Sequence, residues 1–406
     1  MLQNPLLITN RNILIISIQP WYYELGSNCK NIALELSKNN RVLYVNIPIT
    51  RKTYLSTSKS HGIEKHCTVI RSKSETIHKI QDNLWEFYPT SLIESINSLP
   101  FTSLFQIINS FNNQRFAKDI KKALKRMKFE NFILFNDNDI YNGFYLKEYL
   151  QPDIYVYYMR DFLQGYPYWK KHSKVLEPKL IRKADIVVTN SLYYRDYCLQ
   201  FNMCTTYIGQ GCKLDLFNPK SINKIPAELM EIKKPVIGYV GALDSTRLDQ
   251  TIIRTIAESN PEWQIVLVGP EDDTFKQSSL KTLANVHFWG RKPIETLPAY
   301  MLGFNVCMNP QFVNLITHGN YPLKIDEYLA MGKPVVATAT AAMKLFQDYV
   351  YLAQNPEDYP ALIQKALKEH TKSKADAGEQ FAKSHTWENS ISELYKALSA
   401  FEKKRK

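Results

Sequence analysis

The amino-acid sequence predicts an α/β protein made of two facing, Rossmann-like, doubly wound domains with a central cleft. Its 406 residues are the length of two ordinary domains. Short apolar strands alternate with helical segments without tight hairpins, which is typical of parallel sheets with right-handed crossovers. The second half of the chain repeats this alternation. Because open parallel sheets bind ligands beyond the carboxyl ends of their strands, we expect the functional site at the cleft.

The first domain is predicted to span residues 1–218. It opens with an apolar strand at 12–17, a polar turn at 19–28 and a helical pattern through Ile32 and Leu36. Further strands are expected at 41–46, 131–135, 153–158 and 185–189.

The second domain is predicted to span residues 219–385, after a polar, proline-flanked connection at 218–226. A helix is expected at 248–257. Residues 386–406 are expected to form a C-terminal helix with a basic tail that packs back toward the first domain. Strands are predicted at 235–241, 263–269, 286–290, 305–308 and 334–337.

The composition excludes several classes of protein. With 45% hydrophobic and 22% charged residues, the chain is not disordered, collagen-like or a coiled coil. The longest apolar run near the start covers only residues 13–16, against the ~18 residues that cross a bilayer. No secretory signal is recognisable at the start. With neither a spanning segment nor such a signal, we expect a cytoplasmic protein. The six cysteines lack metal-binding spacing, so we expect reduced thiols and no metal site.

The net charge of +12 resides mainly in the first domain. Residues 1–218 contain 28 Lys+Arg and 18 Asp+Glu, whereas residues 219–406 contain 23 and 21. Such asymmetry favours an anionic partner. A basic amphipathic helix is expected at 115–130; its apolar stripe suits packing on the sheet, and its cations suit contact with an anionic membrane surface. The stripe is Phe116, Ile120, Leu124 and Met127, and the cations are Lys118, Lys121, Lys122, Lys125, Arg126 and Lys128.

Residues 318–336, HGNYPLKIDEYLAMGKPVV, resemble the nucleotide-sugar signature of the GT-B glycosyltransferases, especially family 4-like members of the bacterial surface-polysaccharide type. The resemblance covers most of residues 235–400 and is looser in the first half. It extends through 238–242, 266–270, 285–290 and 297–300, and, in the first half, through the loop around Gly26 and through 183–191 and 209–217. It implies the GT-B fold.

The signature has a physical interpretation of its own. Lys324 and Glu327 lie on one face of a helix that starts at Leu323, with Pro322 in its first turn. A helix start with free backbone N–H groups attracts an anionic diphosphate, and Lys324 adds a cation. The resemblance implies that Glu327 accepts hydrogen bonds from the nucleotide ribose. The alternative is an exposed Lys/Glu pair on a solvated helix.

Other donor-side candidates are less specific. Gly241 ends a strand and allows backbone to approach a phosphate, although glycine is also common in plain turns. Arg247 follows this turn and is expected to face the diphosphate, unless it is a surface residue. Many retaining members carry a glutamate where this chain has Gly319, so both retaining and inverting chemistry stay open. The flanking His318 and Asn320 are candidates for sugar contact or for a turn.

In the first domain, a strand at 153–158 runs toward Arg160 and Asp161. Asp161 is the candidate catalytic residue, either as general base on the acceptor hydroxyl or as a sugar-positioning group; a turn or cap role is the alternative. Arg160, Tyr168, Trp169 and the loop residue Gly26 are acceptor-side candidates, since aromatic rings stack on sugars. Core packing explains the aromatic residues almost as well.

Asp137 and Asp139 have the Asp-x-Asp spacing that binds a metal in another glycosyltransferase fold class. Because the remaining pattern is that of GT-B, we expect a turn or capping role for them and no metal.

The resemblance therefore implies a hexosyltransferase-like enzyme of polysaccharide or glycolipid biosynthesis. It would move a sugar from a nucleotide-diphosphate sugar, UDP- or GDP-linked, to a hydroxyl of a glycan or lipid-linked acceptor. No tightly bound cofactor and no nucleic acid are expected, and the protein would be cytoplasmic and peripheral on the inner face of the membrane. Two alternatives stay open: a non-catalytic nucleotide-sugar or glycan-binding protein, and a nucleotide-sugar epimerase of GT-B fold.

Overall fold

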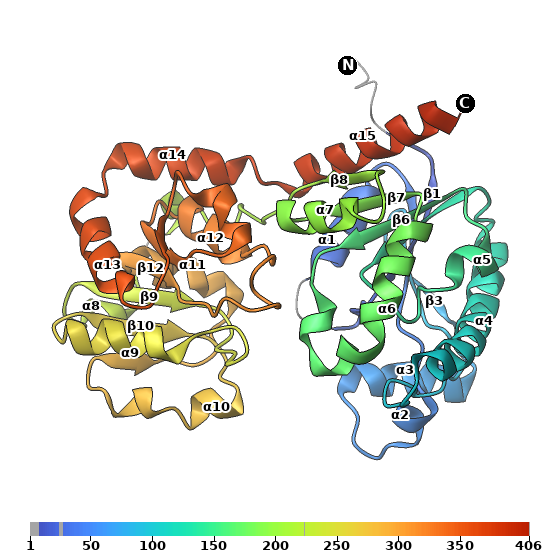
Figure 1. Cartoon of the computed structure of the whole chain (residues 1–406), viewed down its shortest axis with the longest axis horizontal. Helices are drawn as coiled ribbons and strands as arrows, with labels where there is room; N and C mark the ends of the chain where they lie inside the picture. Colours follow the sequence, from blue (N-terminus) through green and yellow to red (C-terminus); the bar gives the residue numbers. More distant parts are fainter. Residues whose placement is uncertain (1–7, 24–26, 223, 406) are drawn as a thin grey trace. The chain divides into compact units, whose positions relative to one another are not determined.

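The computed structural model describes residues 8–23, 27–222 and 224–405. The chain forms two compact units (Figure 1): residues 1–209 with 387–406, and residues 210–386. The first unit ends at Gly209, ahead of position 218, because Leu214, Leu216 and Phe217 pack into the core of the second unit. The backbone N–H of Cys212 also donates to the His385 carbonyl at 2.8 Å.

The first unit contains an eight-stranded sheet in the order β3-β4-β2-β1-β5-β6-β7-β8. All neighbours are parallel except β3 and β4, which form an antiparallel pair. The strands are β1 Asn12–Ser17, β2 Arg41–Val45, β3 Ile77–Gln81, β4 Leu84–Phe87, β5 Phe132–Asp137, β6 Ile154–Met159, β7 Ile186–Thr189 and β8 Thr205–Tyr207. The sequence-based prediction missed β3, β4 and β8.

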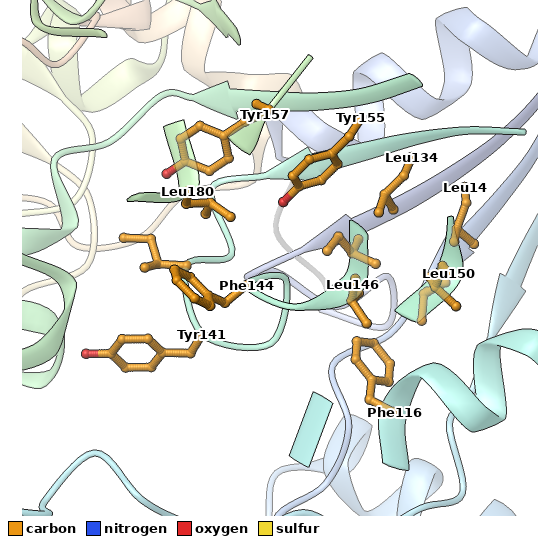
Figure 2. Packing of buried hydrophobic residues seen from close by; sticks show 14 of the residues in the cluster. Leu14, Phe116, Leu134, Tyr141, Phe144, Leu146, Leu150, Tyr155, Tyr157 and Leu180 are labelled. Carbon is orange, nitrogen blue, oxygen red and sulfur yellow. The ribbon is translucent and has the colours of Figure 1, made fainter. Parts of the chain in front are cut away.

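Helices cover both faces of this sheet. Side chains of β1, β5 and β6 meet those of α4, α5 and α6 on one face, where Leu14, Phe116, Leu134, Leu150 and Tyr155 are buried together (Figure 2). α1 and the C-terminal α15 cover the other face. The helices of the unit are α1 Asn28–Ser37, α2 Arg51–Leu55, α3 His61–Ser72, α4 Thr102–Met127, α5 Leu146–Leu150, α6 Pro167–Lys183, α7 Leu192–Leu199 and α15 Trp387–Arg405, with a 3-10 turn, η1, at Leu163–Gly165.

The basic helix expected at 115–130 is longer than predicted and starts earlier. α4 begins at Thr102 and ends at Met127, where Lys128 adopts the left-handed conformation. Its predicted apolar stripe, including Phe116 and Ile120, does pack into the core. The predicted cations on the opposite side remain exposed.

The second unit contains a six-stranded sheet in the order β11-β10-β9-β12-β13-β14, with every neighbouring pair parallel. Its strands are β9 Val236–Val240, β10 Gln264–Val268, β11 Val286–Phe288, β12 Val306–Asn309, β13 Val335–Thr338 and β14 Tyr351–Ala353. Its helices are α8 Ala227–Met230, α9 Gln250–Ser259, α10 Asp273–Lys276, α11 Leu297–Gly303, α12 Leu323–Ala330, α13 Asp358–Glu369 and α14 Lys372–Lys383. The predicted pair of doubly wound α/β domains is confirmed.

The C-terminal helix α15, red in Figure 1, belongs to the first unit. Trp387, Ile391, Leu394 and Leu398 are buried in the core that α1 and the first sheet share. Across the part of the chain that the structure describes, no helix combines the length and hydropathy needed to cross a membrane.

Candidate functional site

A pocket of about 420 Å³ lies in the second unit, between the carboxyl end of β9 and the start of α12. This is the place where an open parallel sheet binds its ligand. Five of the six predicted donor-side residues line it: Gly241, Arg247, Asn320, Lys324 and Glu327.

Helix α12 is fixed against the end of β9 by Tyr328. The Tyr328 hydroxyl accepts from the Val240 N–H at 2.8 Å and donates to the Val240 carbonyl at 3.3 Å. Tyr328 itself is fully buried. Lys324 lies one turn before Tyr328 on the same helix, and Glu327 directly precedes Tyr328. The contact of Tyr328 with β9 therefore holds both residues at the pocket.

Gly241 makes room for Lys324. Its φ is +143°, a conformation that residues with a side chain rarely adopt. A Cβ at this position would lie 3.2 Å from Lys324 Nζ and 3.0 Å from the Tyr239 hydroxyl. A side chain at position 241 would therefore strain the backbone and displace the Lys324 ammonium.

The ammonium of Lys324 is held over the ring of Tyr239. Lys324 Nζ donates to the Tyr239 hydroxyl at 2.8 Å and lies 4.5 Å from the ring centroid. The Tyr239 hydroxyl in turn donates to the Ala242 carbonyl at 3.0 Å. The cation is thus placed at the turn after β9, beside the first backbone N–H groups of α12, which together favour an anion.

Glu327 lies one turn further along α12. Burial raises its pKa to about 7; Lys324 opposes this rise and Asp326 adds to it. Within the described residues, its carboxyl forms no hydrogen bond, although it lines the pocket. A half-buried carboxyl in this state is suited to accept hydrogen bonds from ligand hydroxyls, because those bonds stabilise its charged form.

Arg247 and Asn320 form the opposite side of the pocket. Arg247 Nη1 donates to Asn320 Oδ1 at 3.3 Å, and Arg247 Nε lies 3.8 Å from Asp244. His318 does not line the pocket. Its backbone instead fixes the preceding loop, since its N–H donates to Asn314 and its carbonyl accepts from Ala342.

A buried polar cluster behind α12 escaped the sequence-based prediction. Asp326 is fully buried and accepts from His385 Nδ1 at 2.8 Å and from the Tyr321 hydroxyl at 2.7 Å. Burial raises the pKa of Asp326, and the bonds from His385 and Tyr321 oppose that rise. Because Tyr321 also lines the pocket, its bond to Asp326 holds one wall of the pocket against helix α12.

In the first unit, Arg160 and Asp161 follow β6 as predicted. Arg160 Nη1 donates to Asp161 at 2.6 Å and Arg160 Nε donates to Asp137 at 2.7 Å. The Asn138 side chain accepts from the backbone N–H groups of both residues, at 2.9 Å each. Asp161 is therefore part of an ordered ion-pair network at the carboxyl ends of β5 and β6.

The aromatic candidates occupy different environments. Tyr168 is 54% exposed. Trp169 packs against the first core, with its ring centroid 4.5 Å from that of Tyr141, and its carbonyl accepts from the Tyr141 hydroxyl. Gly26 lies outside the described residues.

The Asp-x-Asp segment has structural partners. Asp137 accepts from Ser17 at 2.6 Å and is paired with Arg160. Asp139 has the expected turn role, because its carboxylate accepts from the backbone N–H groups of Tyr141 and Asn142. In the described parts of the chain, no group of three or more His, Cys, Asp or Glu residues is arranged to hold a metal ion.

Comparison with known proteins shows that part of the sequence is similar to glycosyltransferases. Residues 234–369 match the family model of glycosyl transferases group 1. A Bacillus subtilis (strain 168) protein, named as a teichuronic acid biosynthesis glycosyltransferase, TuaH, is 28% identical over 210 residues, 49% of this chain. The match covers 52% of TuaH, so the chain spans about half the length of this curated relative.

Solved structures resemble the whole chain. Sucrose-phosphate synthase from Thermosynechococcus elongatus superposes with a TM-score of 0.69 at 16% identity, over 96% of this chain and 100% of that one. HepE of Anabaena, solved with UDP and glucose, gives 0.63 at 16%, over 96% and 100%. A trehalose 6-phosphate synthase from Burkholderia multivorans gives 0.68 at 10%, over 98% and 100%. The chain therefore has the fold of the GT-B glycosyltransferases, and its residues 234–369 match their group 1 family.

Proposed function

We propose that the protein is a glycosyltransferase that moves a sugar from a nucleotide-diphosphate sugar to a hydroxyl acceptor in polysaccharide or glycolipid biosynthesis. The observation that carries the proposal is the pocket at the start of α12, where Gly241, Lys324 and Glu327 meet. A diphosphate needs a cation and free backbone N–H groups, and a ribose needs a hydrogen-bond acceptor. This pocket supplies all three within two turns of one helix.

In this proposal the diphosphate lies against Gly241 and Lys324, with Arg247 as a second cation across the pocket. Glu327 accepts hydrogen bonds from the ribose hydroxyls, and Asn320 contacts the donor sugar. His318, which does not line the pocket, acts through its backbone by holding the loop that carries Asn320. The departing diphosphate gains negative charge as the sugar bond breaks, so fixed cations stabilise the transition state more than the ground state. The HepE complexes with UDP and UDP-glucose favour a uridine donor; nothing in the comparisons supports GDP.

For the acceptor side we propose Asp161. As a general base, it would take the proton of the acceptor hydroxyl while oxygen attacks the sugar carbon. Its ion pair with Arg160 would then have to open or be shared with the acceptor. If the sugar is transferred with retention, the leaving phosphate can take this proton and Asp161 positions the acceptor. Tyr168 and Trp169 are proposed acceptor contacts, of which the exposed Tyr168 is the better placed.

We further propose a glycan or lipid-linked acceptor that is met on the cytoplasmic side of a membrane. The excess positive charge of the first domain supports a peripheral position at an anionic surface. A hexose as the transferred sugar is the corresponding proposal for the donor.

Product analysis tests the proposal. The protein is incubated with labelled UDP-glucose, alone and with a membrane lipid extract, and the products are separated. Transfer predicts UDP release and a labelled lipid or glycan only when the acceptor is present, and loss of both in Lys324→Met. A changed sugar nucleotide formed from donor alone would contradict transfer and favour an epimerase, and tight donor binding without any product would favour a binding protein.

A further inference from the structure

Helix α4 exposes an apolar row over its first half. Leu104, Ile107 and Phe111 are 39%, 58% and 58% exposed, and Phe101, just before the helix, is 67% exposed. Their spacing of three and four residues places them along one side of α4. Exposed apolar residues are common singly, but a row on one face marks a surface that contacts something other than water.

The same side of α4 becomes basic over its second half. Lys118, Lys122 and Lys125 continue the spacing of the apolar row, and Lys121 lies beside them. These lysines line a groove of about 750 Å³ together with Arg115 and Tyr149. One continuous face therefore changes from apolar to cationic along the 26 residues of the helix.

This face has no exposed carboxylate of its own helix. The only acidic residue in α4, Asp119, is buried and accepts from the backbone N–H groups of Thr90 and Ser91. Lys122 approaches Asp119 to 3.7 Å. In the part of the chain that the structure describes, Lys118, Lys121 and Lys125 have no ion pair. Two acidic groups lie beside the helix: Glu94 is paired with Arg115, which lines the groove, and Glu75 is paired with Arg126.

Helix α6 packs beside the start of α4 and also carries exposed apolar and cationic residues. It meets the start of α4 where Thr102 Oγ1 lies 3.1 Å from His172 Nδ1 and where Phe105 stacks on His172 at 4.2 Å. Tyr168 and Val175, one turn to either side of His172, are 54% and 42% exposed. The exposed charges of α6 are all cationic, and its one acidic residue, Glu177, is buried. The exposed cations are Lys170, Lys171, Lys174, Lys179 and Arg182.

We propose that α4 and α6 dock the first unit on an anionic lipid surface. The apolar side chains enter the boundary between headgroups and acyl chains, and the lysines lie at the level of the lipid phosphates. Each well-placed cation strengthens such binding about fivefold, and apolar burial adds to it. A soluble polyanion would satisfy the lysines and leave Leu104, Ile107 and Val175 in water. The aliphatic residues therefore favour lipid over nucleic acid.

The inference deepens the proposed function by naming the surface at which a lipid-linked acceptor is met, and it rests on that function only in this respect. Binding to lipid needs no sugar transfer and resides in the first unit, whereas the nucleotide pocket resides in the second. Lipid binding and donor binding therefore succeed or fail separately.

Flotation of the full chain with vesicles tests the proposal, using phosphatidylcholine alone or with one third phosphatidylglycerol. Two variants alter the face: Lys118, Lys121, Lys122 and Lys125 all to Glu, and Ile107→Ser with Phe111→Ser. A matched control reverses four exposed lysines of the second unit that form no ion pair with the residues the structure describes, namely Lys344, Lys365, Lys368 and Lys372. Circular dichroism and urea unfolding check that the first unit of each variant is folded, and UDP binding checks that the second unit is unaffected.

We expect wild type and control to float with the anionic vesicles only. The charge-reversed variant loses four cations, about fivefold each, and should therefore bind at least several hundredfold more weakly, and the Ile107/Phe111 variant roughly tenfold more weakly. Undiminished flotation of the charge-reversed variant would overturn the proposal. A second pair of results would also overturn it: the Ile107/Phe111 variant binds the vesicles as wild type does, and equimolar polyphosphate displaces wild type from them. Those results would indicate a site for a soluble polyanion.

Discussion

His385 donates a hydrogen bond of 2.8 Å to Asp326, which is fully buried on helix α12 behind the pocket. The carbonyl of His385 also accepts from the backbone N–H of Cys212 at 2.8 Å. Residues 210–212 and 384–386 are where the second unit begins and ends. His385 therefore links the two chain segments that enter and leave the second unit to Asp326 of helix α12. Glu327, the residue after Asp326, lines the pocket.

Replacing His385 should destabilise the second unit. In His385→Ala, the buried Asp326 keeps only the bond from Tyr321, and a buried polar group that loses a partner costs about 1–3 kcal/mol. Urea unfolding, followed with and without UDP, measures this cost. Asp348→Asn, at an exposed loop position of the same unit, should leave the free energy of unfolding within ~0.5 kcal/mol. Equal stability of the His385 variant and wild type would show that the pair does not support α12.

Gly241→Ala should weaken nucleotide binding at a modest cost in stability. The new Cβ would lie 3.2 Å from Lys324 Nζ and force a strained backbone, for about 1–3 kcal/mol. We expect UDP affinity to fall at least tenfold because Lys324 must move. Gly290→Ala is the matched control: its φ of +64° carries strain, but no atom lies within 4 Å of the added Cβ. Only stability should change there, and a parallel loss of affinity in both variants would refute the steric argument.

Lys324→Met should weaken UDP binding by 1.5–3 kcal/mol, or about 10- to 150-fold, which is typical of a lost hydrogen bond to a charged group. Tyr239→Phe should cost less, because the ring still lies beneath the ammonium at 4.5 Å. Titration calorimetry at two salt concentrations measures both, and Lys344→Met controls for net charge. If the Lys324 variant retains wild-type affinity, the diphosphate does not bind at this lysine.

The titration of Glu327 predicts the pH dependence of donor binding. Its pKa is raised to about 7 in the folded chain, so the protonated form predominates below that pH. Ribose hydroxyls favour the ionised form, and binding therefore releases a proton. UDP-glucose affinity should rise by up to tenfold per pH unit toward about pH 7 and level off above it. UDP-glucose is used because its phosphates do not titrate in this range.

Glu327→Gln should remove this pH dependence. It should also change how the stability of the fold depends on pH. A carboxyl whose pKa is raised on folding stabilises the folded state below the ordinary carboxyl pKa, and this contribution is lost as the pH rises to about 7. The unfolding free energy of wild type should therefore fall relative to the variant between about pH 5 and pH 7. Parallel pH curves for the two proteins would be inconsistent with a titrating Glu327.

Five of the residues that line the pocket could be selected from the sequence because its parts are local. Lys324 and Glu327 are three residues apart on one helix, and Gly241 ends a strand that is apolar throughout. The Asp326–His385 pair was missed because its members are 59 residues apart and each is an ordinary residue in its own segment. Tyr239 was missed for a similar reason: its hydroxyl meets Lys324 across 85 residues.

Two misses in the fold have identifiable causes. Strand β4 contains Glu86, which faces inward and is nearly buried, so its four residues lack the alternation of a half-exposed strand. The start of α4 was missed because Phe101, Leu104, Ile107 and Phe111 are apolar yet exposed, which hides the boundary between its core side and its solvent side. These same exposed apolar residues indicate the proposed lipid-binding face.

The central claim is that the second unit holds a nucleotide through Glu327, and titration calorimetry with UDP tests it most directly. Wild type should bind UDP, and Glu327→Ala should bind it about 10- to 150-fold more weakly. Glu262→Ala, at an exposed position in the same unit, should match wild type. Equal UDP affinity of wild type and Glu327→Ala, or no binding of UDP by wild type, would contradict the account.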